Sequence, residues 1–116
     1  MQRKFRLTRS TDFKRVRREG KSYAHPFLVL VVQASEAPRV RVGVTAGRSV
    51  GGAVQRNRAK RLLREAIRPL LPDLPHGWDL ILIARSVLLT ASLHDTREAL
   101  TDLLRHAKLL SQSDES

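Results

Sequence analysis

Cationic side chains crowd one stretch in the middle of this chain. Six lysine or arginine residues lie between positions 56 and 68, against one acid, Glu65. Because a helix turns about 100° per residue, the polar side chains that share one face are Asn57, Lys60, Arg61, Arg64 and Arg68. The side chains roughly opposite are Leu62, Leu63, Ala66, Ile67 and Leu70. The spacing therefore predicts a helix over about 53–70, with one face for a core and the other for an anion.

No constellation for catalysis or metal binding stands beside this helix. The four histidines are scattered, without H-x-x-x-H or H-E-x-x-H spacing, and the carboxylates form no closely spaced pair. The glycine-rich stretch 47–52 lacks the Gly-Lys-Ser/Thr ending of a nucleotide-binding P-loop. Asp79 precedes an apolar run, where we expect it to help end a loop. The sequence thus predicts no catalytic and no metal-binding residue, so a reactive group would come from another molecule.

The charge balance of the whole chain indicates a polyanionic partner. The 116 residues suit one domain with a modest core, and they carry a net charge of +11. Arginine predominates, and its planar guanidinium fits phosphate better than lysine does. No cysteine is present, which excludes disulfides and Cys-ligated zinc and fits the cytoplasm. The charged start predicts no secretory signal, and the longest apolar run, 27–32, is too short to span a membrane.

The pattern along the chain predicts a small α+β domain in the order α-β-β-α-β-α. A helix over 8–18 has Ser10 or Thr11 as its candidate cap, and apolar strands follow at 27–34 and 39–45. The short turn between these strands predicts an antiparallel hairpin. After the basic helix come a strand over 79–85 and a helix that Ser92 can cap, with an apolar stripe at Leu93, Leu100, Leu103, Leu104, Ala107 and Leu110. We expect one domain over 1–110, its sheet covered by helices, and a polar tail over 111–116.

A second basic group lies near the N-terminus, beside the chain's few aromatic side chains. Its members are Arg3, Lys4, Arg6, Arg9, Lys14, Arg15, Arg17, Arg18 and Lys21. Two separate clusters can hold two nucleic-acid segments or one large one. Phe13 and Phe27 could stack on unpaired bases there, or they could belong to the core.

The run from Arg56 to Glu65 closely resembles the signature of the protein subunit of bacterial ribonuclease P. The resemblance covers roughly 80 residues in order, and its other parts are the stretches 7–20, 41–44, 51–54 and 79–85. For the fold, it implies the order α-β-β-(β)-α-β-α, with one further strand before the basic helix. It also implies a left-handed βαβ crossover that contains the basic helix, an exception to the usual hand.

For function, the resemblance implies a protein that assists endonucleolytic removal of the 5′ leader from precursor tRNA. In this family the RNA subunit holds the catalytic Mg²⁺ ions, and the implied partners are ribonuclease P RNA and precursor tRNA, with no membrane. The residues implied to face the RNA subunit are Arg48, Arg56, Asn57, Arg58, Lys60, Arg61, Arg64 and Arg68. Those implied to contact the leader, in a cleft between the first helix and the sheet, are Phe13, Arg17, Phe27 and Val29. Arg17 stands where the family often has an aromatic residue, so this cleft would stack less and attract phosphate more.

Two other interpretations of the same residues stay open. Another RNA-binding protein of similar small α/β layout, such as a ribosomal protein, would also carry a basic helix. A DNA-binding regulator could place that helix in a major groove, although no second helix is predicted a short turn away. The match at Phe13, Gly43, the signature and Ala84-Arg85 favours ribonuclease P.

Overall fold

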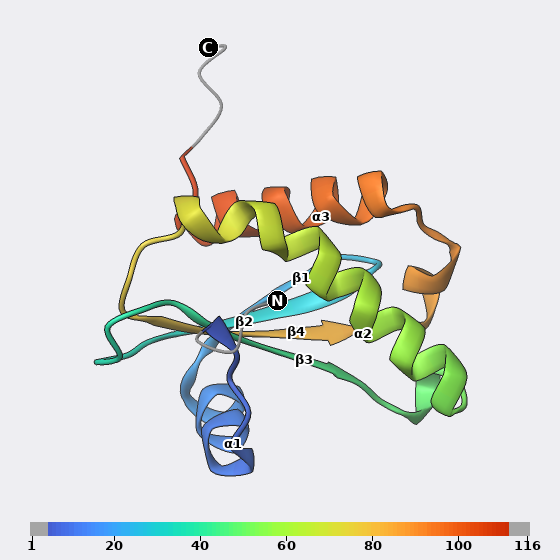
Figure 1. The fold of residues 1–116 in the computed structure, drawn as a ribbon, viewed down its shortest axis with the longest axis horizontal. Helices are drawn as coiled ribbons and strands as arrows, with labels where there is room; N and C mark the ends of the chain where they lie inside the picture. The colour runs from blue at the N-terminus through green and yellow to red at the C-terminus, as the bar shows by residue number, and fades with distance from the viewer. Residues whose placement is uncertain (1–4, 112–116) are drawn as a thin grey trace.

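The computed structural model describes residues 5–111, which form a four-stranded sheet with one helix on one face and two on the other (Figure 1). Most of the predicted tail, 112–116, lies outside the described residues, as do Arg3 and Lys4. Within 5–111, no helix is long and apolar enough to cross a membrane. The elements in chain order are α1 (Ser10–Glu19), β1 (Lys21–Ala24), β2 (Leu28–Ala34), β3 (Arg41–Ala46), the 3-10 helix η2 (Arg48–Val50), α2 (Ala53–Ile67), η3 (Arg68–Asp73), β4 (Trp78–Ala84), η4 (Ser86–Thr90) and α3 (Leu93–His106).

The strands lie in the order β1-β2-β4-β3, which makes the sheet mixed. β2 is antiparallel to β1 and to β4, and β3 is parallel to β4. The predicted hairpin of strands 27–34 and 39–45 is therefore wrong, because β4 lies between β2 and β3. β2 and β4 are apolar on both faces, so both gain most from the centre of a sheet that is covered on both sides. The further strand that the family resemblance implied is present as β1.

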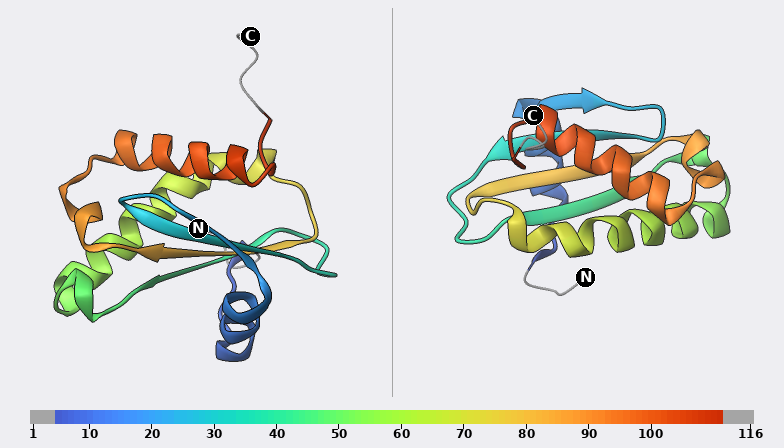
Figure 2. Two further views of the ribbon diagram at one scale, coloured as in Figure 1. Left: turned by 180° about the vertical axis from the view of Figure 1, so that it is seen from behind. Right: turned by 90° about the horizontal axis from the view of Figure 1, so that it is seen from above.

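The crossover from β3 through α2 to β4 has the unusual hand. Seen from the side of α2 and α3 (Figure 2, right), the two strands run the same way with α2 in front of them. When that direction is turned upward, β4 lies to the left of β3, so the connection is left-handed. This confirms the crossover that the resemblance implied.

Alternation along β2 and β4 sends side chains into two separate cores. Leu28, Leu30 and Val32 pack with Leu80 and Leu82 against α2 and α3. Val31 and Ile81 face the other way and form a smaller cluster with α1, completed by Leu7 and Val16. The sheet thus lies between α1 on one face and α2 and α3 on the other.

Helix ends follow local chemistry in some places and tertiary contacts in others. Ser92 caps α3 as predicted, because its Oγ accepts a hydrogen bond from the amide of Asp95 at 2.9 Å. The predicted cap of α1 is wrong. Ser10 already lies within the helix and Arg9 is the cap residue, with no side-chain hydrogen bond. The amide of Leu7 donates to Val42 of β3, and the chain enters α1 soon after this anchor. α2 ends at Ile67, before the proline-containing η3.

Candidate nucleic-acid interface

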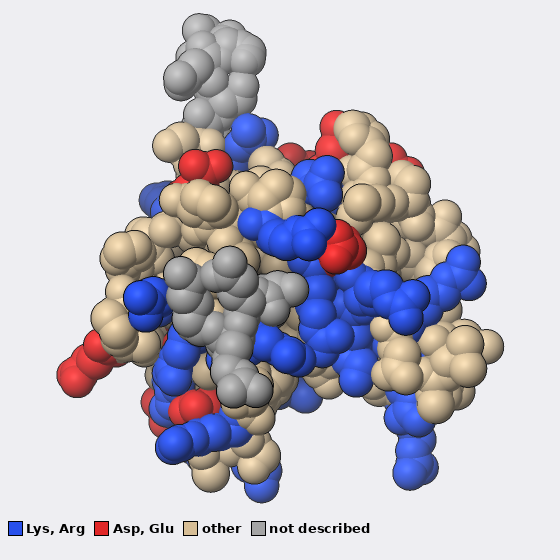
Figure 3. All heavy atoms as spheres, viewed as in Figure 1, with Lys and Arg blue, Asp and Glu red and all other residues tan. Residues whose placement is uncertain are grey.

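Helix α2 separates its cations from its apolar side chains, as the spacing predicted. Ala59, Leu63, Ala66 and Ile67 are buried against the sheet and α3. Asn57, Arg58, Arg61 and Arg68 are exposed, and Arg56, Lys60 and Arg64 are half-buried. Arg48, the other residue predicted to face RNA, is exposed in η2, just before α2 begins. In the view of Figure 1, lysine and arginine side chains gather in a band over α2 (Figure 3).

Most of the charge on α2 has no internal counter-charge. The helix holds one acid, Glu65, whose carboxylate accepts from Arg68 Nη2 at 2.6 Å. No carboxylate within residues 5–111 pairs with the other cations of the basic stretch, which are Arg56, Arg58, Lys60, Arg61 and Arg64. The exposed face of α2 therefore keeps a concentrated positive charge, whereas Arg68, the first residue of η3, is neutralised by Glu65.

The last turn of α2 is fixed by a side chain of α3 that sequence reasoning did not single out. Arg97 donates from Nη2 to the carbonyl of Glu65 at 3.2 Å and from Nε to the carbonyl of Ala66 at 3.4 Å. Carbonyls at a helix end lack partners within the helix, so a cation satisfies them and complements the helix dipole. Arg97 thereby helps hold the basic helix in place. Nothing in the local sequence pattern marks it for this contact.

A small pocket joins α2 to the surface beside α1. It measures about 180 Å³, and its lining includes Arg6, Phe13, Gly43, Val44 and Arg64. The Nε of Arg64 is buried, and no group in the described residues hydrogen-bonds to it. Burial and the nearby positive charge of Arg6 together lower the pKa of Arg64. The pocket thus places two cations next to one aromatic ring.

Glycine is required where Phe13 meets the sheet. A Cβ on Gly43 would lie 2.9 Å from Cε2 of Phe13 and closer still to its Cζ, so the ring occupies the space that a side chain would need. Phe13 itself is half-buried and packs with Val29 and Ile83 on the α1 side of the sheet. The position of Gly43 in β3 therefore sets how close the ring comes to the pocket.

The four residues predicted to contact a leader do not gather in one place. Phe13 and Val29 share the α1 side of the sheet, and Arg17 is exposed one helical turn beyond Phe13. Phe27 packs instead against the larger core, on the side of α2 and α3, with its ring centroid 4.9 Å from that of His25. Phe27 is therefore separated from Phe13 by the sheet.

We expected Asp79 to help end a loop. Instead it lies within β4 and is the centre of a buried ionic network. Its side chain is fully buried. Arg41 of β3 donates to it from Nε at 2.9 Å and from Nη2 at 2.8 Å, and Arg15 of α1 donates at 2.7 Å. Asp12 adds a second carboxylate, 3.3 Å from Arg15 and 3.9 Å from Arg41. Arg15 also donates to Gln33 of β2. Two of the basic residues near α1 are thus committed to structure.

The network keeps Asp79 ionised. Burial opposes the charged carboxylate, but hydrogen bonds from Arg41 and Arg15 outweigh burial and lower the pKa of Asp79. The same hydrogen bonds raise the pKa of both arginines. Because the network ties α1 to β3 and β4, it fixes the helix that carries Phe13.

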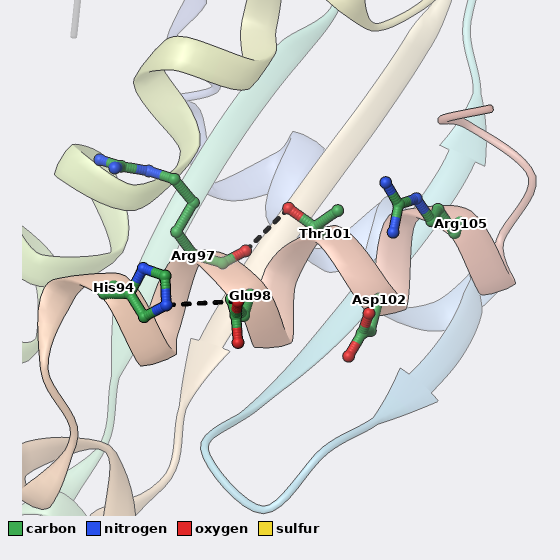
Figure 4. Close-up of a pocket in the computed structure, with 6 residues that line it drawn as sticks. All are labelled: His94, Arg97, Glu98, Thr101, Asp102 and Arg105. Carbon is green, nitrogen blue, oxygen red and sulfur yellow. Dashed lines mark hydrogen bonds and ion pairs between the residues drawn. The ribbon is translucent and has the colours of Figure 1, made fainter. Parts of the chain in front are cut away.

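A third site, on α3, is a surface groove of mixed charge. About 410 Å³ in volume, it is lined by side chains of α3 alone (Figure 4), and His94 lies 3.2 Å from Glu98 within it. Arg97 and Thr101 at the same groove are engaged with backbone carbonyls. Among residues 5–111, no three histidine, aspartate or glutamate side chains could together hold a metal ion. None of the residues predicted to bind RNA or the leader lies in this groove.

Comparison with known protein families gives a match that covers every helix and strand described above. A model of the family described as "Ribonuclease P" matches residues 1–108. The chain is 44% identical to the ribonuclease P protein component of Herpetosiphon aurantiacus over 109 residues, which cover 94% of this chain and 89% of the relative. It is 43% identical to that of Chloroflexus aurantiacus over 111 residues, covering 95% and 82%.

Solved structures agree with the sequence comparison. The RNase P protein of Staphylococcus aureus superposes with a TM-score of 0.82 at 27% identity, covering 92% of this chain and 98% of that one. The RNase P protein of Thermotoga maritima gives a TM-score of 0.77 at 30% identity, covering 87% and 96%. Similarity of sequence and of fold therefore extends well beyond the basic helix.

Proposed function

The chain belongs to the ribonuclease P protein family, as a protein component of that endoribonuclease, and we propose that α2 is its docking surface for ribonuclease P RNA. One observation carries the proposal. The exposed face of α2 presents Arg56, Arg58, Lys60, Arg61 and Arg64 without a carboxylate partner in the described residues. Precursor tRNA is the substrate that such an enzyme processes, and this role supports the prediction that the protein acts in the cytoplasm.

Phosphate binding explains why this face keeps its charge. Each phosphate neutralised by a cation releases condensed counterions, so aligned cations give strong, salt-dependent affinity. Arginine can also bind phosphate through two parallel hydrogen bonds. Asn57, exposed among these cations, can hydrogen-bond to a base edge or a ribose hydroxyl. Arg68 contributes less, because Glu65 already neutralises it.

We further propose that the pocket beside Phe13 receives part of the 5′ leader. A phosphate between Arg6 and Arg64 would relieve the repulsion of these two cations and give the buried Nε of Arg64 a partner. The half-buried ring of Phe13 offers an edge for an unpaired base. The leader site then comprises Phe13 and Val29, with Arg17 nearby. Phe27 lies on the other side of the sheet and is left out.

The Mg²⁺ ions that hydrolyse the phosphodiester bond are, in this proposal, held by the RNA. Bound there, such an ion would supply an activated water molecule and charge stabilisation for the leaving oxygen. Among the described residues no three histidine, aspartate or glutamate side chains are grouped so that they could hold a metal ion, and our proposal assigns the ions to the RNA. The protein's part is to bind and position the two RNAs.

Salt dependence of RNA binding tests the docking surface. Arg58→Ala and Arg61→Ala should each weaken binding of the cognate ribonuclease P RNA. Each should also reduce the slope of log affinity against log salt by about one unit. Arg39→Ala, an exposed cation in the turn before β3, is the matched control and should leave the slope unchanged. Filter binding over a salt series measures the affinity and its slope. Cleavage of precursor tRNA at low Mg²⁺ reports the activity of the assembled enzyme. If all three variants keep the slope of the unmodified protein, α2 is not part of the interface.

A further inference from the structure

An apolar pocket of about 250 Å³ lies between α2 and the η4–α3 connection. Figures 1 and 2 show this connection in orange beside the green first half of α2. Leu62 of α2 lines the pocket together with Leu89 of η4, Ala91 of the connection and Leu93, the first residue of α3. Leu93, a member of the apolar stripe that we predicted for α3, is 38% exposed. The pocket is therefore an apolar recess that the core leaves open.

The charges around this recess are those of the basic helix. Arg58 and Arg61 line it and are exposed, whereas Leu62, Leu89 and Ala91 are half-buried, so the cations stand at its edge. Neither arginine has a carboxylate partner within residues 5–111. Glu65 also lines the recess, but its carboxylate is paired with Arg68. The site combines an apolar floor with a positive rim on the surface proposed to bind RNA.

We propose that this recess receives one unstacked nucleobase of the RNA that α2 binds, with Arg58 and Arg61 holding the phosphates beside it. The inference rests on the proposed function and adds a base-binding site to it. An unstacked nucleotide has the matching chemistry, since its base has apolar faces and its phosphates are anionic. Proteins that take a base out of its stack hold it between aromatic or apolar side chains, and RNA-binding proteins also stack splayed-out bases on guanidinium planes.

Size and position favour a single base over a larger ligand. The volume falls below the roughly 300–1,000 Å³ of pockets that bury drug-sized molecules. The two arginines lie three residues apart on α2, nearly one helical turn, so they can bracket one nucleotide. A continuous double helix would keep its bases stacked and leave the recess empty. The proposal therefore commits to a bulged, looped or terminal nucleotide of the RNA.

Apolar contact and phosphate contact respond differently to salt. Binding by cations weakens steeply as salt rises, because it depends on counterion release. Insertion of a base into an apolar recess releases no counterion, so it adds affinity without changing the slope. A variant that fills the recess should therefore weaken binding equally at every salt concentration.

The experiment uses the full chain and its cognate ribonuclease P RNA. Ala91→Leu fills the recess and leaves every charge in place. It should weaken RNA binding about tenfold, the scale of one stacked base, at an unchanged salt slope. Leu93→Ala, which removes part of the apolar wall, should weaken binding several-fold in the same way. The matched control is Val87→Leu, which adds bulk to an exposed apolar residue of η4 outside the recess and should bind normally. Thermal melting checks that all three variants fold.

The outcomes separate this inference from the proposed function. Normal affinity of a folded Ala91→Leu variant would overturn the base-binding site while leaving α2 as the docking surface. A loss of affinity with a reduced slope would assign the effect to displaced arginines and would also overturn it. If the unmodified protein itself fails to bind the RNA, the proposed function fails first.

Discussion

Replacing Asp79 by asparagine should destabilise the protein by about 2–3 kcal/mol at neutral pH. The carboxylate is fully buried and accepts three hydrogen bonds, two from Arg41 and one from Arg15. Removing one partner of a buried ion pair typically costs about 3–5 kcal/mol, because the remaining charge is left unpaired. Here the arginine side chains are 30% and 31% exposed and keep Asp12 nearby, so water and Asp12 recover part of that cost.

The same network predicts the pH dependence of the effect. The pKa of Asp79 is lowered in the folded protein, so its stabilisation is fully present above the pKa of the unfolded chain, about 3.9. It is lost as pH falls through the lower, folded-state pKa. Asparagine does not titrate. The stability difference between the two proteins should therefore be constant near neutral pH and should shrink only below about pH 4.

Urea unfolding at a series of pH values measures both statements. The midpoint should fall while the m-value stays the same, because the exposed area on unfolding is unchanged. Asp73→Asn is the matched control, since Asp73 is exposed, and it should change stability by less than about 0.5 kcal/mol. A difference of similar size for Asp73 and Asp79, or one that persists undiminished in acid, would refute the role assigned to the network.

Two further predictions concern the ring of Phe13. Gly43→Ala should destabilise the fold by about 1–3 kcal/mol in urea unfolding, because the new methyl group meets the ring, whereas Gly47→Ala, with nothing within 4 Å, should be near neutral. Phe13→Ala should weaken binding of leader-bearing precursor tRNA to the reconstituted holoenzyme roughly tenfold and leave binding of leaderless tRNA unchanged. Equal losses for both tRNAs would remove Phe13 from the leader site.

Local sequence patterns predicted the basic helix α2 well. The positions of Leu63, Ala66 and Ile67 relative to the cations fix which face is buried, since a helix repeats every 3.6 residues whatever surrounds it. The cap at Ser92 is equally local, because the side chain reaches an amide three residues away. The basic face of α2 could therefore be predicted from spacing alone.

Strand order could not be predicted in the same way. An apolar pattern shows that a segment forms a strand but does not choose its neighbour, and a short turn between two strands indicated the wrong pair. β4 follows β3 by more than thirty residues yet pairs with both β2 and β3. Covering both faces of the two apolar strands decided this arrangement.

The sequence by itself determined the composition of this protein's surfaces, because charge excess and helical spacing are properties of the chain. Only the tertiary structure decided which of those charges are available. It brought Arg15 and Arg41 to Asp79 across 64 and 38 residues of chain, so hydrogen bonds to one buried carboxylate engage both guanidinium groups. It also placed Arg64 of α2 beside Phe13 of α1, and Leu93 beside Arg58. Such contacts depend on how helices pack across a sheet, where residues far apart in sequence compete to bury apolar area and to pair charge.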